Sequence, residues 1–412
     1  MPYRVRGAPF KWGGTCSLQE TAISKGKHSV IYLDNAATTA TSRTALEAMM
    51  PFFTQEFGNP SSVHEAGSRA EWAVDQARVR MAQALGCLPR QVEFTSGGTE
   101  SDNQALLTGA LRGAQCNRRH IVSSAIEHPA VLRMLERLGA RGFDVTLVAP
   151  DERGIVPAEA VEAALRPDTC LVSLMWVNNE VGGIQPVKQV AALCHARGIL
   201  FHSDAVQAAG VLPMDWHDLG ADLVSISAHK FHGPKGVGAL VVRDGLEPAS
   251  LLVGGEQERG HRAGTLNVPG IVGMSVALEE AQAASERNAS YVRTLRAKLT
   301  GGLTALGQVR VLGADDPQLT APGIVCACFK DLDRETLLVL LDQAGICASA
   351  GSACSAGAVE RSHVLQAMRV PDEWARGAIR FSLGADNTAA EIDETLAALR
   401  GIVAHLRERR AR

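Results

Sequence analysis

A lysine and a carboxylate close two successive apolar runs in the middle of the chain. Lys230 ends the stretch LVSISAHK, and Asp204 ends the stretch ILFHSD. A charged amine at the mouth of a buried sheet is costly, whereas a neutral amine, or one bound as a Schiff base to a carbonyl cofactor, is tolerated there. The alternative is a solvated lysine at a strand end, a description that fits Lys235 in the turn GPKG better.

A glycine-rich turn adds a candidate phosphate site. The stretch SGGTE (96–100) follows the apolar run VEFT and opens a helical segment. Free backbone N–H groups and the helix dipole favour an anion at such a place, although an ordinary turn has the same composition. The turn is not a Walker A loop and the chain has no GxGxxG, so nucleoside triphosphates and NAD are disfavoured as ligands.

An acid, a lysine and a phosphate turn together meet the needs of pyridoxal 5'-phosphate (PLP). This cofactor takes a carboxylate on its ring nitrogen, to keep the pyridinium protonated as an electron sink, and a lysine on its aldehyde. Each of the three features could be structural when taken alone. Their combination makes a PLP site the favoured interpretation.

Other polar residues stand where they could serve such a site. His128 in EHPAV could cap a helix, or could stack on a cofactor ring and move protons near neutral pH. Asn179 and Gln207 follow two further apolar runs. Arg380, within AIRFSL, offers a planar two-pronged cation that suits a substrate carboxylate, but an arginine on an exposed strand face is equally consistent.

The elements that must position these residues follow from the alternation of the chain between residues 90 and 245. Short apolar runs are each followed by a polar or glycine-rich turn and often by a helical segment. This pattern predicts an α/β fold with a large, mainly parallel sheet covered by helices on both faces. Ligands bind such sheets outside the carboxyl ends of the strands, so the polar clusters should meet along one edge.

The pattern changes after about residue 270. One long helical stretch, or two, leads to a second alternating unit that predicts a smaller α+β domain. We expect the large domain to span 41–280, and the small domain to comprise 29–40 and 281–412. Residues 1–28 contain no acid before Glu20 and are expected to be a disordered extension. A transit peptide is the alternative, which the prolines and glycines of this stretch oppose.

Composition limits the class of protein. The 412 residues are 46% hydrophobic and 21% charged, with a formal net charge of −3. These values predict a globular protein that binds neither nucleic acid nor membrane, since no apolar run approaches the ~18 residues of a span. The nine cysteines include no CxxC pair, which argues against a disulfide framework or a zinc site and favours the cytoplasm. His229 and His232 lack a third ligand for a metal.

The ordered set of motifs resembles a known family. The motifs run from residue 33 to residue 368 and are LDNAATT, FGNPSSVH, TSGGTESDN, EHPAV, WVNNEVG, DAVQ, SAHKFHGPKGVG, GGEQERGHRAGTLN and SAGSACSAG with SHVLQAM. They resemble the NifS/IscS-type cysteine desulfurases, which are PLP enzymes of the class-V aminotransferase family with the aspartate aminotransferase-like fold. The resemblance covers about residues 31 to 400 and implies a large seven-stranded sheet domain.

The resemblance implies a role for each matching residue. The implied catalytic residues are Lys230 as the Schiff-base lysine, His128 stacked on the ring, and Cys354 as the nucleophile. The residues implied to hold the cofactor are Gly98, Thr99, His128, Asn179, Asp204, Gln207, Ser227, His229 and Lys230, with Asp204 on the pyridine nitrogen and Gln207 on the ring hydroxyl. Thr265 would reach the phosphate of the neighbouring subunit, which implies a homodimer. Asn35 and Arg380 would bind the carboxylate of L-cysteine.

Cys354 lies in a stretch without large apolar side chains that could bury its thiol. The sequence ASAGSACSAG (348–357) is built of Ala, Ser and Gly around one thiol, although a free cysteine is usually a small buried hydrophobe. The resemblance implies a loop of about 348–362 in which Cys354 takes sulfur from the substrate. The products would be L-alanine and a persulfide, passed on to an acceptor protein for iron–sulfur cluster assembly or thiolation. Ten extended residues span up to ~33–36 Å, enough for a flexible loop to deliver sulfur.

The other cysteines of this region have plainer interpretations. Cys326 and Cys328 alternate in an apolar run and are expected in the core. Cys347 could accept sulfur, but core packing is favoured. Gly98 stands where many members of the family have alanine, a small change at a turn that binds through its backbone.

Two alternatives to the desulfurase stay open at this point. A selenocysteine lyase of the same fold would not need Cys354 for turnover. A non-catalytic sulfur carrier or cluster scaffold would bind no PLP.

Overall fold

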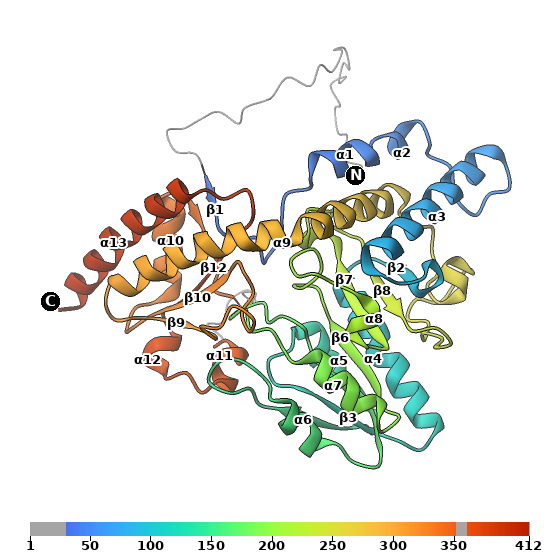
Figure 1. Cartoon of the computed structure of the whole chain (residues 1–412), viewed down its shortest axis with the longest axis horizontal. Coiled ribbons are helices and arrows are strands. Elements are labelled where there is room, and N and C mark those ends of the chain that lie inside the picture. The colour runs from blue at the N-terminus through green and yellow to red at the C-terminus, as the bar shows by residue number, and fades with distance from the viewer. Residues whose placement is uncertain (1–29, 352–360, 412) are drawn as a thin grey trace, which may run out of the picture.

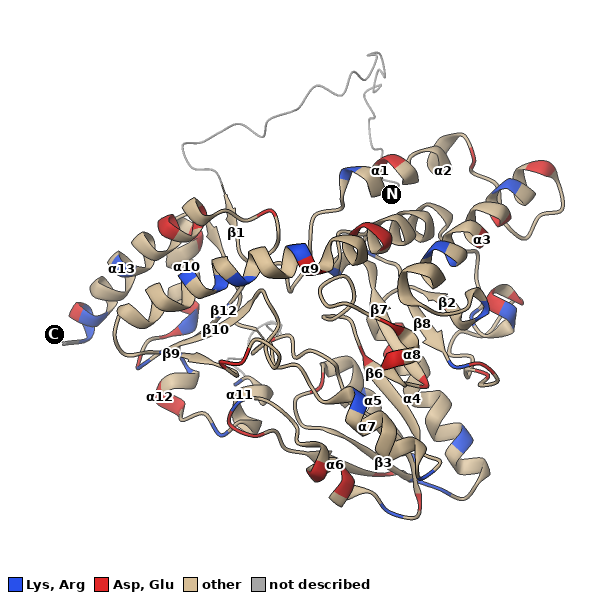
Figure 2. Cartoon of the chain, viewed as in Figure 1, with Lys and Arg blue, Asp and Glu red and all other residues tan. Residues whose placement is uncertain are grey.

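The computed structural model describes residues 30–351 and 361–411. The predicted extension 1–28 and the predicted nucleophile Cys354 lie outside these residues. Within the described residues no helix is both long enough and apolar enough to cross a membrane. Figure 2 shows acidic and basic residues interspersed over the outer helices, in line with the small net charge.

A seven-stranded sheet forms the centre of the larger unit (Figure 1). Its strand order is β2 (Val92–Thr95), β8 (Gly238–Val242), β7 (Leu223–Ser227), β6 (Leu200–Asp204), β5 (Thr169–Ser173), β3 (His120–Ser124) and β4 (Asp144–Val148). Only β8 runs antiparallel to its neighbours. The predicted mainly parallel seven-stranded sheet is therefore confirmed. The predicted polar clusters follow the carboxyl ends of β2, β3, β5, β6 and β7, which share one edge.

Helices cover both faces of this sheet. One face packs on α4 (Gly98–Gln115) and α5 (Pro129–Gly139), whose buried residues join alternate side chains of the strands, such as Leu171 and Leu200. The other face belongs to a larger core, which takes the intervening side chains, such as Val172 and Phe201. The helices that complete the larger unit are α1 (Arg43–Met49), α2 (Pro51–Thr54), α3 (Glu65–Leu85), α6 (Ala158–Ala164), α7 (Val187–His195) and α8 (Trp216–Leu219).

The smaller unit is built on two further sheets. β12 (Ala378–Ser382), β10 (Ile324–Phe329) and β9 (Val309–Leu312) form an antiparallel sheet, and β1 (Ile31–Tyr32) pairs in parallel with β11 (Ile346–Cys347). The helices of this unit are α10 (Arg334–Gln343), α11 (His363–Ala367), α12 (Asp372–Ala375) and α13 (Ala389–Ala411). Cys326 and Cys328 are buried in the middle strand β10, as expected from their alternation.

One helix joins the two units. The stretch that the sequence left as one helix or two is a single helix, α9 (Val268–Ala305). Its residues up to Leu278 pack in the core of the larger unit, and those from Val292 onward pack in the core of the smaller one. The predicted division near residue 280 falls between these two stretches, and as a statement about domains it stays a prediction.

Candidate active site

Asp204 ends β6 at the shared edge of the sheet and is only 5% exposed. One of its oxygens, Oδ1, accepts a hydrogen bond from the backbone N–H of Val206 at 2.9 Å. Burial raises the pKa of this carboxyl, while His128 and Lys230 favour its charged form. Its other oxygen has no hydrogen bond to the described residues, and a buried carboxyl of this kind fits a cationic ring nitrogen, which PLP would supply.

Lys230 follows the neighbouring strand β7, in a single turn of 3-10 helix (Ala228–Lys230). Its Nζ donates to the backbone carbonyls of Ala36 at 2.7 Å and Ala37 at 2.9 Å. Burial and, second, the charge of Arg380 lower the pKa of the amine to about 8. The amine therefore gives up its proton far more readily than an ordinary lysine, as Schiff-base chemistry requires.

A cleft beside these two residues carries the chemistry of a phosphate site. The residues that line it are Thr38, Ser96, Gly97, Gly98, Thr99, Glu100, Ser227, His229, Lys235 and Gly236. Gly97 precedes α4 with φ 152° and ψ −179°, a conformation open only to glycine, and it caps the helix without a side chain. The first N–H groups of any α-helix have no intrahelical partner, and here no side chain of the N-cap residue occupies them, which is the arrangement that holds an anion.

Two basic side chains of the cleft differ in charge. His229 bonds through Nδ1 to Thr38 Oγ1 at 3.2 Å, and burial, followed by Lys230 and Lys235, lowers its pKa to about 4. It is therefore a neutral ring near pH 7. The turn GPKG predicts that Lys235 is a solvated turn residue. It is exposed, but it also lines the cleft, a position that the turn GPKG alone does not reveal.

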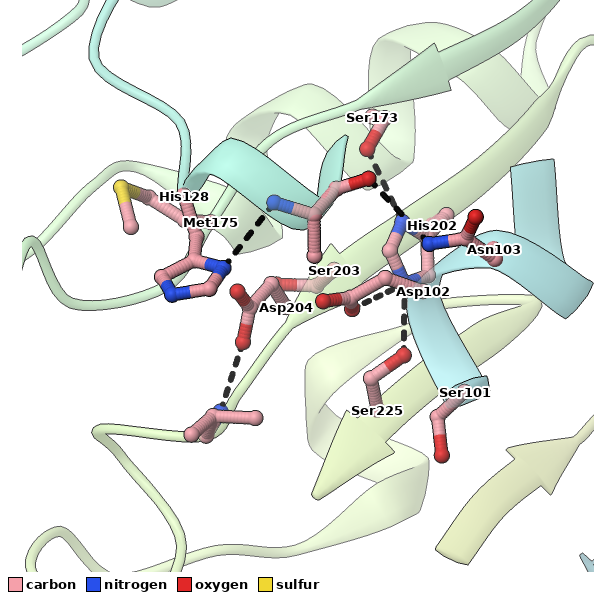
Figure 3. Close-up of polar contacts among 12 residues, drawn as sticks. Ser101, Asp102, Asn103, His128, Ser173, Met175, His202, Ser203, Asp204 and Ser225 are labelled. Carbon is pink, nitrogen blue, oxygen red and sulfur yellow. Dashed lines mark hydrogen bonds and ion pairs between the residues drawn. The ribbon is translucent and has the colours of Figure 1, made fainter. Parts of the chain in front are cut away.

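His128 caps α5 and lies close to Asp204 (Figure 3). Its Nδ1 accepts the backbone N–H of Ala130 at 3.1 Å, so the neutral ring carries its proton on Nε2. Burial lowers the pKa of this imidazole, and Lys230 and His363 act in the same direction. The capping role considered from the sequence is confirmed, and it leaves Nε2 for other partners.

A buried polar layer under Asp204 was not predicted (Figure 3). His202 lies two residues earlier on β6 and bonds to Ser173 Oγ at 2.9 Å and to Ser225 Oγ at 3.0 Å. Burial lowers the pKa of His202 to about 3. Asp102 of α4 lies 3.6 Å from Nε2 of the same ring, and burial raises the pKa of its carboxyl. The run ILFHSD contained a signal, because a histidine inside an apolar strand must find polar partners.

A second buried acid, Glu127, precedes His128. It accepts from Ser124 Oγ at 2.5 Å and from the backbone N–H of Met175 at 2.9 Å. Burial raises the pKa of Glu127 to about 8. The carboxyl is therefore mostly protonated at neutral pH and adds little negative charge beside Asp204.

Arg380 lies inside β12 and is 4% exposed, so the alternative of an arginine on an exposed strand face is wrong. Its Nη2 forms an ion pair with Asp34 Oδ1 at 2.8 Å, and its Nη1 donates to the carbonyl of Asn179 at 2.9 Å. Asn35, next to Asp34, donates from Nδ2 to the carbonyl of Ser382 at 2.9 Å. The structure thus places Asn35 at the last residue of β12, two residues from Arg380.

Gln207 and Asn179 also lie near this centre. Gln207 Nε2 donates to the carbonyl of Ala36 at 2.9 Å, the same carbonyl that Lys230 contacts. Asn179 is half-buried in a turn that Asn178 holds, since Asn178 Oδ1 accepts from the N–H groups of Glu180 and Val181, each at 2.9 Å. Asn179 was predicted from the sequence as a site residue, whereas Asn178, which is wholly buried, was not.

Thr265 is the predicted cofactor residue that stands apart. It is exposed and is absent from the described lining of the cleft. The segment that carries it is fixed by Glu258, which pairs with Arg78 at 2.6 Å and accepts from the backbone N–H of Phe94 at 2.7 Å. This segment lies beside α3 and β2 (Figure 1).

The stretch around Cys354 has described residues on either side. Ser362 Oγ donates to Glu180 Oε2 at 2.5 Å, and the carbonyl of Gly351 lies 3.4 Å from Arg380 Nη1. Both ends of the stretch therefore lie close to the residues that surround Arg380. Cys354 itself lies outside the described residues, so its place relative to Lys230 stays a prediction.

Comparison with known proteins identifies the family. Residues 31–395 match the family described as Aminotransferase class-V. The chain belongs to this family. Two curated relatives are a cysteine desulfurase of Gluconacetobacter diazotrophicus, 46% identical over 92% of this chain and 95% of its own, and the cysteine desulfurase IscS of Methanosarcina thermophila, 43% identical over 92% and 94%. The chain thus stands among the cysteine desulfurases of the class-V family.

Solved structures agree with this assignment. A NifS-like protein superposes with a TM-score of 0.86 at 40% identity, covering 92% of this chain and all of its own. A structure described as SspA in complex with cysteine matches with a TM-score of 0.76 at 33% identity, over 87% of this chain and 100% of its own. The family depends on PLP, and the buried Asp204, the low-pKa Lys230 and the open start of α4 fit that cofactor. The predicted enzyme class, fold and cofactor are confirmed.

Proposed function

We propose that this cysteine desulfurase removes sulfur from L-cysteine beside Lys230 and receives it as a persulfide on Cys354. One observation carries the proposal. A lysine whose pKa falls to about 8 and a buried carboxyl end adjacent strands, beside a helix start that is open to an anion. The relatives named cysteine desulfurases support the substrate and the reaction. The selenocysteine lyase and sulfur-carrier alternatives lack such support.

When bound, PLP supplies an electron sink for the pair of electrons left as the α-proton of the substrate departs. Asp204 would hold the proton on the ring nitrogen, and its burial strengthens that interaction because little water competes. Lys230 would grip the cofactor through its amine. With a pKa of about 8, the amine would be basic enough to take a proton and weak enough to return it near neutral pH.

The cleft at the start of α4 would hold the phosphate. Gly98 and Thr99 offer backbone N–H groups, Ser227 offers a hydroxyl, and His229 offers a neutral ring. Lys235 would add a positive charge at the rim. Glu100 also lines the cleft, and Arg262 pairs with it at 2.9 Å, so its charge is offset.

His128 would lie against the cofactor ring and present Nε2–H, because Nδ1 is committed to the cap of α5. Gln207 would meet the ring hydroxyl and Asn179 would contact the cofactor nearby. Arg380 and Asn35 would hold the substrate carboxylate. Binding at two points orients the α-proton and the thiol of the substrate, which is how positioning lowers the barrier.

Cys354 would accept the sulfur. Its thiolate would form a new S–S bond to the sulfur of the substrate while the carbon–sulfur bond breaks. The electron pair of that bond would stay with the carbon, which takes up a proton. L-cysteine and one thiol thus give L-alanine and one persulfide, with no external oxidant. The persulfide is a reversible form of the cysteine, suited to delivery to an acceptor protein that serves iron–sulfur assembly or thiolation.

A homodimer would complete the site. Thr265 is exposed and would reach the phosphate in a second copy of the chain. Large exposed apolar residues support such an interface. They lie on α1, α2 and α3, in the loops that join these helices, and in the segment before Thr265, and they are Leu46, Met50, Phe53, Phe57, Val63, Trp72, Leu252 and Val253. Where such side chains adjoin, exposed apolar surface is typical of an interaction site.

The test uses the purified full-length protein and L-cysteine. We expect the protein to purify yellow and to form L-alanine and reducible sulfur, with Lys230→Ala colourless and inactive. Cys354→Ala should stay yellow and lose sulfur transfer. Cys116→Ala removes an exposed thiol that has no part in the proposed reaction, and it should behave as the parent. A Cys354→Ala protein with full turnover would favour the selenocysteine lyase alternative.

A further inference from the structure

We propose that Asp34 competes with the substrate carboxylate for Arg380 and thereby sets how tightly the enzyme binds carboxylate-bearing ligands. The inference rests on the proposed role of Arg380 in binding that carboxylate. Asp34 would be a built-in occupant of the anion site, present whenever the substrate is absent.

The guanidinium of Arg380 has room for one more acceptor. Arg380 is 4% exposed, and Nη2 pairs with Asp34 at 2.8 Å. Nη1 donates to the carbonyl of Asn179 at 2.9 Å and lies 3.4 Å from that of Gly351. Nε is buried and has no hydrogen-bond partner among the described residues. A buried donor without a partner is costly, so the guanidinium retains capacity for one more acceptor.

Asp34 and Arg380 differ in how far each side chain is exposed to solvent. The side chain of Asp34 is 21% exposed, against 4% for Arg380. Asp34 can therefore be rehydrated when it leaves Arg380, whereas Arg380 cannot leave its strand. A substrate carboxylate would therefore displace a counter-ion that can move into water.

Asp34 lies in a segment that also carries proposed site residues. Its neighbour Asn35 is the other proposed carboxylate ligand, and the next two carbonyls, of Ala36 and Ala37, hold the amine of Lys230. Ser382, two residues beyond Arg380 on β12, bonds through its backbone to Asn35 and through Oγ to Ala36. The segment that carries Asp34 thus includes Asn35 and contacts both Arg380 and Lys230.

Charge decides the direction of the effect. Among the described residues, Asp34 is the carboxylate in direct contact with Arg380. The nearby Glu180 bonds instead to Ser362, and burial raises its pKa. A second carboxylate on the same guanidinium must either displace Asp34 or bind beside its negative charge. Both routes weaken binding relative to a free arginine, because only the fraction of Arg380 that is available contributes to the apparent affinity.

The central experiment is Asp34→Asn in the holoenzyme, which removes the charge and keeps the shape. We expect the KM for L-cysteine to fall about fivefold with kcat changed by less than about twofold. The dissociation constant of the product L-alanine, followed through the absorbance of the bound cofactor, should fall by a similar factor. Asp34→Glu should keep the weaker binding of the parent. Asp393→Asn, which removes a carboxylate from the exposed pair with Lys298, should leave KM unchanged.

Arg380→Gln separates this inference from the proposed function. If Arg380 binds the substrate carboxylate, Arg380→Gln raises the KM for L-cysteine and not that for L-cysteine methyl ester, which lacks the charge. An unchanged KM for L-cysteine overturns the proposed role of Arg380. If Arg380→Gln raises KM while Asp34→Asn leaves it equal or higher, the competition proposed here is overturned and Asp34 assists binding. Asp34→Ser, with the same expected fall in KM, is measured alongside in case the asparagine variant folds poorly.

Discussion

A methyl group at Gly98 would lie 2.7 Å from Cγ2 of Val206, closer than real carbon contacts allow. Gly98 begins α4 at the edge of the phosphate cleft, and Val206 follows Asp204. The two residues form a matched pair in which the larger side chain of one occupies the space that the other leaves. Val206 therefore gives a physical reason why this chain has glycine at position 98, where the family resemblance leads one to expect alanine in many members.

Gly98→Ala should loosen the phosphate cleft through this contact. Overpacking of a buried position costs about 1–3 kcal/mol, and here the shift would move the N–H groups that face the phosphate. We expect a lower melting temperature of the holoenzyme and a several-fold weaker affinity for PLP, measured by equilibrium titration. The double variant Gly98→Ala, Val206→Ala should recover both values. Failure of the second change to recover them would show that the contact is not the cause.

Lys230 should react with PLP at a lower pH than an ordinary lysine. The neutral amine is the reactive form, and a folded-state pKa of about 8 means that it accumulates as the pH rises through 8 rather than through ~10.4. The rate of PLP uptake by the apoprotein, followed by absorbance, should rise with pH and level off above about 9. Arg380→Gln removes one cause of the shift and should move the midpoint to higher pH. A midpoint above 10 in the parent contradicts the effect of burial.

These features divide clearly into those that the sequence could predict and those that it could not. Asp204, Lys230 and the turn before α4 were predictable because each directly follows an apolar run, and parallel strands bring such positions to one edge. The Asp34–Arg380 pair and the Gly98–Val206 contact join residues more than a hundred positions apart. Nothing in local periodicity encodes which distant side chain fills a space or balances a charge. Resemblance to a family could assign Arg380 a ligand but not its resting partner.

Glu127 should make the stability of the apoprotein depend on pH. Its folded-state pKa of about 8 lies above the unfolded value near ~4.3, so the folded chain binds more protons between these limits. The free energy of unfolding therefore falls as the pH rises from about 5 to 8. Glu127→Gln keeps acceptors for Ser124 and for Met175 N–H and removes the titration. Denaturant unfolding of this variant should vary less with pH over that range.

A matched control is Glu162→Gln. Glu162 pairs with Arg197 on the surface, with its side chain 45% exposed. Its removal should leave the pH dependence of the parent intact. Equal slopes for the parent and Glu127→Gln would mean that Glu127 is ionised in the folded protein, and that another acid holds the extra proton.

Glu258 should control how firmly the segment of Thr265 is held. Its side chain is 1% exposed and pairs with Arg78 at 2.6 Å, while its backbone has φ 47°, a conformation that is strained for a residue with a side chain. Glu258→Gln leaves Arg78 buried without its counter-ion, and breaking such a pair costs about 3–5 kcal/mol. Since the segment would reach a second copy of the chain, we expect a weaker dimer by sedimentation and faster loss of PLP on dilution. Glu256→Gln changes an exposed acid two residues earlier and should alter neither measurement. If Glu258→Gln lowers the melting temperature but leaves both dimer and PLP retention unchanged, the ion pair stabilises one subunit alone and does not position Thr265.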